Sequence, residues 1–207
     1  MNNDKYNEIK FEAKGIYKAK GSKFISYAFP VYCEQHIKTK IEHIKKVEHS
    51  ARHYCYAYVL NENKSIQRTN DDGEPSSTAG KPILGQILSN NLTNILIIVT
   101  RYFGGVKLGA SGLINAYKLS SSDAISKSKI IQKTIKEEYE VIFKYNQINK
   151  VIKIIKQFKL DIKYKNLNIE SNVIFAVSKN KTDTVLNAFK KDHTIKIKKL
   201  KKQNEIT

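Results

Sequence analysis

Hydrophobic and polar side chains alternate with two different periods in the first sixty residues. Residues 11–20 and 22–32 are rich in aromatic and β-branched side chains, which predicts two strands joined by a turn. In residues 34–48, isoleucine and valine recur every three or four positions between lysine and glutamate, which predicts an amphipathic helix. Residues 53–60 predict a further strand with three tyrosines on one face and small apolar side chains, suited to the core, on the other. The polar residues 61–70 that follow are expected to form a loop.

The chain is organised around residues 71–117, which hold seven of its nine glycines and two of its three prolines. An acidic turn at residues 71–75 precedes a helix that is expected to end near Asn90. Residues 94–103 are a continuous apolar run and predict a buried central strand, after which come a glycine loop and another helix. Two unusual loops that flank one buried strand commonly form a binding surface. We therefore expect them to shape an outward-facing pocket for negatively charged ligands.

The pattern starts again near residue 136, after a connection at residues 127–135. The predicted elements then follow the order βαββαβ, which is the plan of ferredoxin-like domains. We therefore predict an α+β protein of two domains, an α/β sandwich in residues 1–133 and a ferredoxin-like βαββαβ domain in residues 136–207. The second domain contains no cysteine and cannot hold an iron–sulfur cluster.

The net charge of the chain indicates one class of binding partner. The 207 residues carry a formal net charge of +18, which favours contact with polyanions such as nucleic acid. Lysine outnumbers arginine 34 to 3, and asparagine and isoleucine are abundant, so part of the charge reflects the drift of an AT-rich genome. Residues 1–135 carry 20 basic and 11 acidic side chains, and residues 136–207 carry 17 and 8. The second part is therefore the more basic per residue.

The sequence also indicates the cellular compartment in which we expect the protein. No run of eighteen apolar residues occurs, so we expect no membrane association, and the first residues lack the apolar segment of a signal peptide. Cys33 and Cys55 form neither a disulfide framework nor a metal-ligand spacing. We expect a cytoplasmic protein with reduced thiols, no metal and no cofactor.

The candidate anion or nucleic-acid site consists of five residues, Lys81, Arg101, Lys107, Gly104 and Gly105. Lys81 stands at the start of a helix preceded by serine and threonine, which can cap it, and such a helix start can hold a phosphate. Arg101 closes a buried strand and must pair with something. The two glycines let the backbone turn sharply and approach a ligand, with Lys107 on the same loop. The spacing of a phosphate-binding Walker A loop is absent.

The acidic turn carries three carboxylates, Asp71, Asp72 and Glu74. One interpretation is a metal or acid–base site, although Mg²⁺ usually takes only one or two carboxylates plus waters. The other is a structural turn whose carboxylates cap neighbouring backbone groups or form an ion pair with Arg101. Both interpretations stay open at this point.

Cys55 could act as a nucleophile with His53 as its base. The two residues lie two positions apart on one predicted strand, but no oxyanion-hole motif follows them. A free cysteine is usually a small buried hydrophobic residue. We therefore predict no catalytic residue.

Three segments of the sequence together resemble the YigZ/IMPACT family. They are ARHYCYAY at residues 51–58, DDGEPSSTAGKPIL at residues 71–84 and VTRYFGGVKLGASGL at residues 99–113. Three blocks in the right order are far more specific than one glycine motif, and the resemblance covers nearly the whole chain. Ser111 and Asn115 depart from the family's pattern, in which glycine and a basic residue are common at these positions.

The resemblance implies two α/β domains and a link to translation. The first domain would be similar to domain IV of elongation factor G and to a small-subunit ribosomal protein domain. The second would be similar to the last domain of the same factor. Eukaryotic members of the family act in translational control through protein partners.

We therefore expect a translation-associated protein that binds RNA or the ribosome, and not an enzyme. One alternative is a hydrolase for a small phosphorylated or peptide substrate, in which the acidic turn, His53 and Arg101 converge in one cleft. Another is a protein-interaction module with a protein partner in place of RNA. An exposed face of Tyr54, Tyr56 and Tyr58 would favour it, because aromatic side chains anchor interfaces.

Overall fold

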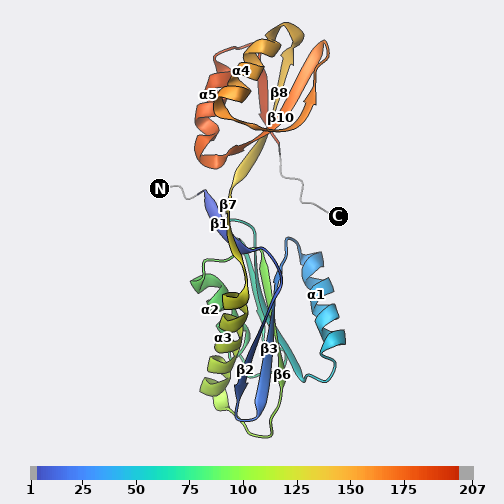
Figure 1. The fold of residues 1–207 in the computed structure, drawn as a ribbon, viewed down its shortest axis with the longest axis vertical. Coiled ribbons are helices and arrows are strands. Elements are labelled where there is room, and N and C mark those ends of the chain that lie inside the picture. The colour runs from blue at the N-terminus through green and yellow to red at the C-terminus, as the bar shows by residue number, and fades with distance from the viewer. Residues whose placement is uncertain (1–3, 201–207) are drawn as a thin grey trace. The chain divides into compact units, whose positions relative to one another are not determined.

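The computed structural model describes residues 4–200, which form two compact units with separate hydrophobic cores (Figure 1). Lys5–Lys133 form the first unit, and residues 134–200 together with Asp4 form the second. Asp4 joins the second unit because its carbonyl oxygen accepts a hydrogen bond from the N–H of Ile135 at 2.6 Å. Both units combine helices with antiparallel sheet, as the predicted α+β class requires.

The first unit is built on a five-stranded antiparallel sheet. In spatial order its strands are β2 (Ala13–Ala19), β3 (Ser22–Pro30), β6 (Ile95–Tyr102), β4 (His53–Leu60) and β5 (Ile66–Asn70). The apolar run of the central stretch is β6, which lies in the middle of the sheet with all but its last residue buried. The prediction of a buried central strand is thus confirmed.

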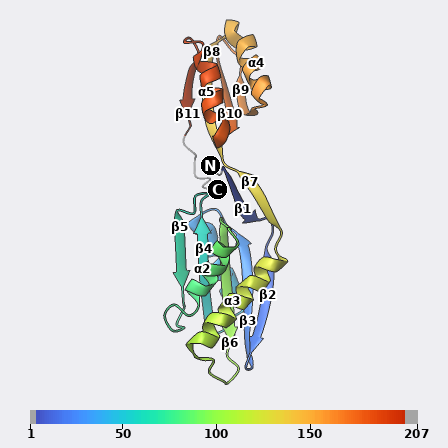
Figure 2. The same ribbon diagram turned by 90° about the vertical axis from the view of Figure 1, so that its left-hand side faces the viewer.

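Helices cover both faces of this sheet, as Figure 1 shows edge-on, and Figure 2 looks onto one of these two faces. Helix α1 (Glu34–Val47) packs on one face, while α2 (Gly80–Ser89) and α3 (Gly109–Lys127) pack on the other. The alternation of β4 follows from this arrangement, because its small side chains enter the core under α2 and α3 and its tyrosines enter the core under α1. Tyr58 is only 5% exposed, and Tyr54 and Tyr56 are half-buried. These three tyrosines therefore do not form the exposed face that would have favoured a protein-interaction module.

Three strands were not predicted. Residues 66–70, expected to lie in a polar loop, form the edge strand β5. The other two are β1 (Lys5–Ile9) and β7 (Ile130–Thr134), which pair in a separate two-stranded sheet, and β7 lies in the expected connection at residues 127–135. Their polar side chains hide the strand pattern, since an edge strand buries few of them.

The second unit has the predicted βαββαβ order. Its elements are β8 (Lys136–Lys144), the short 3₁₀ helix η1 (Tyr145–Gln147), α4 (Ile148–Phe158), β9 (Asp161–Asn166), β10 (Glu170–Ser178), η2 (Lys179–Lys181), α5 (Thr182–Lys190) and β11 (Lys196–Lys199). The strands form an antiparallel sheet in the order β11-β8-β10-β9. Both helices pack on one face of it, around a core that includes Phe175 and Phe189.

No helix within residues 4–200 combines the length and the apolar character that crossing a membrane would require.

Gly15 sets the distance between β2 and α3. A Cβ atom at this position would lie 2.4 Å from the backbone nitrogen of Ala124 and 2.6 Å from the Oγ of Ser26. The hydroxyl of Ser26 is held there because it donates a hydrogen bond to the carbonyl of Ser120 at 2.6 Å. Only glycine leaves room for the helix to approach this closely.

We predict that Gly15→Ala lowers the free energy of unfolding by about 1–3 kcal/mol, because the methyl group overpacks a contact with backbone atoms. Gly85→Ala is the matched control, since Gly85 lies inside α2 with no neighbour near its missing Cβ atom. That substitution should stabilise the protein by about 0.5–1 kcal/mol. Urea denaturation of both variants measures the difference, and equal midpoints would contradict the prediction.

Candidate functional site

The acidic turn and the glycine loop lie at the same end of the five-stranded sheet. In the ladders, Arg101 near the end of β6 pairs with His53 at the start of β4, and Tyr102 pairs with Lys23 at the start of β3. The acidic turn and the glycine loop were expected to lie at opposite ends of β6, and this expectation is wrong. Helix α2 leads the chain from the acidic turn to the other end of the sheet, and β6 then leads it back to the first end. We call this end the loop end; it comprises the β2–β3 turn at residues 20–21, the start of β4, residues 71–81 and residues 103–112.

The acidic turn is attached to the start of β4. The N–H of Glu74 donates to the carbonyl of Asp71 at 2.9 Å, and both central residues have positive φ, 40° for Asp72 and 83° for Gly73. The carboxylate of Asp72 accepts a hydrogen bond from the N–H of Tyr54 at 2.7 Å, and Nδ1 of His53 lies 2.8 Å from the carbonyl oxygen of Asp72. The turn is thus a closed structural unit.

The carboxylate of Asp71 caps α2. One of its oxygens accepts from the N–H groups of Ala79 at 3.0 Å and Gly80 at 2.8 Å, and the other from the N–H of Ser77 at 2.8 Å. Burial alone would raise the pKa of Asp71, but these three donors outweigh it and hold the pKa below its ordinary value. Capping by the serine and threonine side chains was one expectation, but the hydroxyl of Thr78 donates to the carbonyl of Pro75. The alternative, in which a carboxylate of the acidic turn caps neighbouring backbone groups, matches the contacts of Asp71. The helix start that could have held a phosphate is therefore occupied by the protein's own carboxylate.

Arg101 is buried and paired. Its side chain is 8% exposed, and Nη1 donates to Oε1 of Glu74 at 2.7 Å. The same carboxylate oxygen accepts from the hydroxyl of Tyr117 on α3 at 2.8 Å. Of the two interpretations of Arg101, this geometry supports the structural ion pair. Tyr117 escaped the sequence analysis because only the tertiary structure brings α3 against the acidic turn.

The thiol of Cys55 belongs to the same buried network. Its Sγ lies 3.0 Å from the carbonyl oxygen of Asp71 and 3.3 Å from the hydroxyl of Tyr117. Burial raises the pKa of this thiol strongly, so it stays protonated and unreactive. His53 bonds to the acidic turn and not to Cys55. Across residues 4–200, no group of three or more histidine, cysteine, aspartate or glutamate side chains could hold a metal ion.

The glycine loop approaches the β2–β3 turn closely. A Cβ atom on Gly104 would lie 1.9 Å from the carbonyl carbon of Gly21, and the N–H of Gly104 donates to the Oγ of Ser22 at 3.2 Å. Gly105 has a φ of 87° and is exposed, as is Lys107. The helix that follows, α3, begins without a side-chain cap and without an acidic residue in its first turn. Its first N–H groups therefore have no hydrogen bond from a capping side chain.

An exposed aromatic residue lies beside two arginines at the loop end. Phe103 is 42% exposed, and the guanidinium carbons of Arg101 and Arg52 lie 5.5 Å and 6.0 Å from the centre of its ring. Arg52 is exposed, and its N–H donates to the carbonyl of Arg101 at 3.1 Å. Neither Phe103 nor Arg52 was predicted as a site residue, although both lie within the segments that resemble the family.

Four cations of the loop end face outward, Lys20, Arg52, Lys81 and Lys107. The ion pairs found in the described part of the chain include none of them. The three carboxylates of the acidic turn, in contrast, are all bound by groups of the protein itself. The exposed cations of the loop end thus lie beside carboxylates that other groups of the protein already hold.

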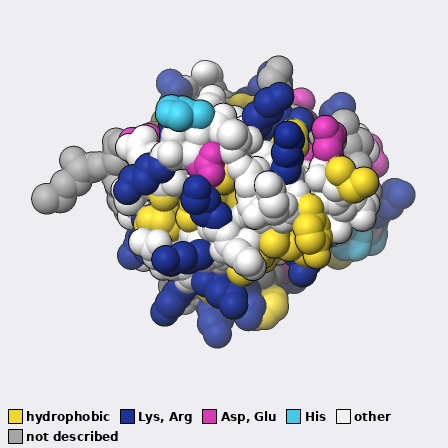
Figure 3. Space-filling model, turned by 90° about the horizontal axis from the view of Figure 1, so that it is seen from above, with side chains coloured by type: hydrophobic (Ala, Val, Ile, Leu, Met, Phe, Trp, Pro, Cys, Tyr) yellow, Lys and Arg dark blue, Asp and Glu magenta, His cyan; other side chains and the backbone are white. Residues whose placement is uncertain are grey.

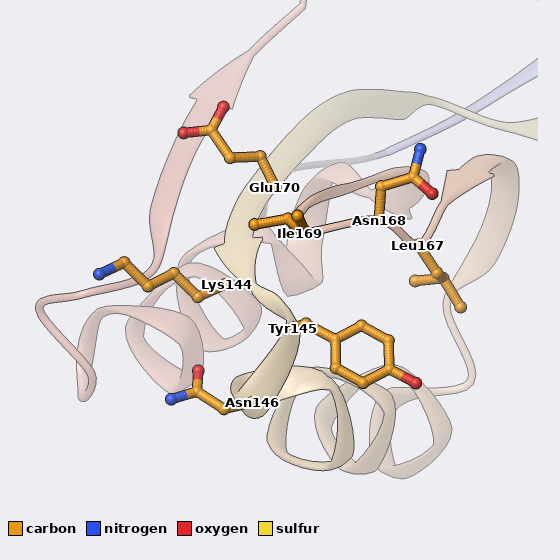
Figure 4. Close-up of a pocket in the computed structure, with 7 residues that line it drawn as sticks. All are labelled: Lys144, Tyr145, Asn146, Leu167, Asn168, Ile169 and Glu170. Atoms are coloured by element: carbon orange, nitrogen blue, oxygen red, sulfur yellow. The ribbon is translucent and has the colours of Figure 1, made fainter.

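A hollow of about 680 Å³ lies elsewhere, at the tip of the second unit (Figure 4). Its lining is Lys144, Tyr145, Asn146, Leu167, Asn168, Ile169 and Glu170. Tyr145 and Ile169 are 60% and 88% exposed, and Figure 4 shows the ends of Lys144 and Glu170 pointing away from the tyrosine ring. This wide, open hollow brings together no acid–base pair and was not predicted.

Comparison with known proteins places the chain in a family. Residues 20–125, which include the whole loop end, match the model of the Impact N-terminal domain. The protein YvyE of Bacillus subtilis, named an IMPACT family member, is 36% identical over 168 residues, which are 81% of this chain and 76% of YvyE. The chain belongs to the IMPACT family.

Two further comparisons agree with this membership. YigZ of Escherichia coli, another IMPACT family member, is 31% identical over 77% of this chain and 78% of its own length. A crystal structure of a hypothetical protein superposes with a TM-score of 0.70 at 23% identity, and the match covers 97% of this chain and 99% of that one. The second similarity shows that both units have the fold of a known protein.

We predict that Glu74→Gln lowers the free energy of unfolding by about 3–5 kcal/mol, because it leaves the buried charge of Arg101 without its counterion. Glu42→Gln, on the exposed side of α1, is the control and should change stability by less than about 0.5 kcal/mol. Urea denaturation near neutral pH measures both. An unfolding midpoint for Glu74→Gln equal to that of the wild type would show that the ion pair does not organise the loop end.

We predict that Asp71→Asn destabilises the protein by about 1–2 kcal/mol near neutral pH, through loss of a charged cap. The native pKa of Asp71 is lowered, so its contribution is complete above the pKa of the unfolded chain, about 3.9, and disappears as the pH falls through the native value. The difference between variant and wild type should therefore shrink below about pH 4. Unfolding curves recorded across this range test the sign, and a pH-independent difference would contradict it.

Proposed function

We propose that this protein binds ribosomal or other structured RNA in the translation apparatus, and that the loop end is its contact surface. One observation carries the proposal: four exposed cations of the loop end form no ion pair in the described residues, whereas its three carboxylates all accept hydrogen bonds from the protein. Polyanion binding depends on such uncompensated positive charge, because lysine and arginine release counterions from the phosphate backbone.

The glycine loop suits a phosphate group. Gly105 has open space where a Cβ atom would lie, so no side chain keeps a ligand from the backbone there, and Lys107 follows on the same loop. Gly104 lets the loop pack against the β2–β3 turn beside it. The first turn of α3 adds N–H groups and the positive end of a helix dipole. Lys81 supplies a further exposed charge, whereas buried Arg101 supports the loop from beneath.

Phe103 adds a means to contact a base. Sequence-independent RNA binding often combines cations with an aromatic ring on which an unstacked base can lie. The exposed part of Phe103, with Arg52 beside it, offers this combination. The loop end therefore fits a bulge or loop of structured RNA better than a uniform duplex.

Family membership supports the link to translation. The IMPACT family resemblance implies translational control for its eukaryotic members, and we extend that role, with a cytoplasmic location, to this chain as part of the proposal. The hydrolase alternative gains no support from the geometry, because Cys55 and His53 do not pair and the carboxylates already bind backbone groups.

The test is sedimentation of the full chain with ribosomes at salt concentrations between about 50 and 200 mM. We expect binding that weakens steeply with salt. The double variant Arg52→Glu/Lys107→Glu should weaken binding at least about tenfold and reduce the slope of log K against log salt by about 2.

Lys5→Glu/Lys38→Glu is the control, since both lysines are exposed away from the loop end and the change in net charge is the same. It should weaken binding by less than about threefold, because solvent screens distant charges. Absence of binding at the lowest salt concentration, or equal losses in the two double variants, would refute the proposal.

A further inference from the structure

The lysines of the second unit are distributed unequally between its helices and its sheet. Figure 3 shows the protein from the top of the view in Figure 1, and the face turned to the viewer carries many lysine and arginine side chains and few acidic ones. Seven exposed lysines belong to α4, η2, α5 and the residues that follow each helix: Lys153, Lys156, Lys159, Lys179, Lys181, Lys190 and Lys191. The ion pairs found in residues 134–200 include none of these seven.

The lysines of the sheet have carboxylate neighbours. Lys136 and Lys163 both pair with Asp161, at 3.2 Å and 3.0 Å. On β11, Lys198 pairs with Glu140 at 2.7 Å and Lys199 with Glu137 at 2.6 Å. The remaining strand lysines, Lys144, Lys165 and Lys196, share the sheet with two further carboxylates, Glu138 and Glu170. Charge is therefore nearly balanced on the sheet and strongly positive on the helices.

Compositional drift toward lysine does not explain this separation. Drift adds lysines at exposed positions of helices and strands alike, yet five carboxylates accompany the lysines of the strands and only two, Asp183 and Asp192, accompany those of the helix layer. Within the helix layer itself, Asp183 is exposed and Asp192 is already paired with Lys150 at 2.6 Å. Three of the seven lysines lie within α4 and α5 (Lys153, Lys156 and Lys190), and the other four lie on η2 or directly after a helix. Positive charges without an ion-pair partner repel one another, and a bound polyanion would remove that repulsion.

We propose that the helix layer of α4 and α5 binds the phosphate backbone of double-helical RNA. This inference deepens the proposed function, on which the choice of RNA as the polyanion rests, and it gives the second unit a contact surface of its own. The two helices pack side by side on one face of the sheet, so their outward lysines are held on a rigid surface.

The chemistry of the helix layer favours a duplex over a single strand. Single-stranded nucleic acid is held largely by stacking on aromatic side chains. The exposed tyrosines of this unit, Tyr145 and Tyr164, lie on η1 and β9 and not on its two α-helices. Lysine offers only a point charge, and duplex RNA is recognised mainly through its backbone and shape.

The experiment measures fluorescence anisotropy of the full chain with a labelled RNA duplex of about 20 base pairs and with a single strand of the same length. We expect the duplex to bind more tightly. Lys153→Glu/Lys190→Glu should weaken duplex binding at least about tenfold and reduce the salt slope by about 2. Both residues are exposed on helices, so circular dichroism should show that the variant folds as the wild type does.

The matched control is Lys144→Glu/Lys196→Glu, which changes the net charge equally but on the sheet. It should weaken duplex binding by less than about threefold. Equal losses in both variants, no loss in either, or tighter binding of the single strand would overturn the inference.

The two proposals fail separately. If ribosomes do not bind but the duplex binds through Lys153 and Lys190, the proposed function fails and the helix layer stands as a duplex-binding surface. If Arg52→Glu/Lys107→Glu abolishes ribosome binding while the helix-layer variant binds the duplex as the wild type does, the inference fails alone.

Discussion

One buried carboxylate joins the elements that build the loop end. Glu74 comes from the acidic turn and accepts hydrogen bonds from Arg101 at the end of β6 and from Tyr117 on α3. A buried charge is tolerated only when it is paired and hydrogen-bonded, so this contact fixes where turn, strand and helix meet. It also withdraws the only arginine of the central stretch from the surface. The outward charge beside the glycine loop comes instead from Lys107 and Arg52.

The same principle applies to the rest of the acidic turn. Asp71 caps α2 and Asp72 binds the start of β4, so the negative charges of this segment are used to hold backbone groups in place. The exposed cations nearby, Lys20, Arg52, Lys81 and Lys107, form none of the ion pairs found in the described residues. Exposed cations beside carboxylates that the protein already holds are the physical basis for proposing an anionic ligand there.

The second unit separates charge by a different route. Its strands place lysine opposite or next to glutamate and aspartate, whereas its two helices bury an apolar stripe and leave lysine on the outside. Each unit thus has one surface on which exposed lysines or arginines form none of the ion pairs found in the described residues.

The sequence by itself determined the elements whose side chains alternate with a clear period, namely α1, β4, β6 and the βαββαβ order of the second unit, because burial of one face imposes that period. It missed the edge strand β5, since the backbone of β4 and not a core specifies it. It left open whether adjacent hydroxyl groups or the carboxylates of the acidic turn cap backbone groups, and only the folded chain shows Asp71 at the start of α2. Only the tertiary structure shows that the carboxylate of Glu74 pairs with Arg101. Arg101 lies 27 residues and Tyr117 lies 43 residues from Glu74 along the chain, and only folding brings the three side chains together.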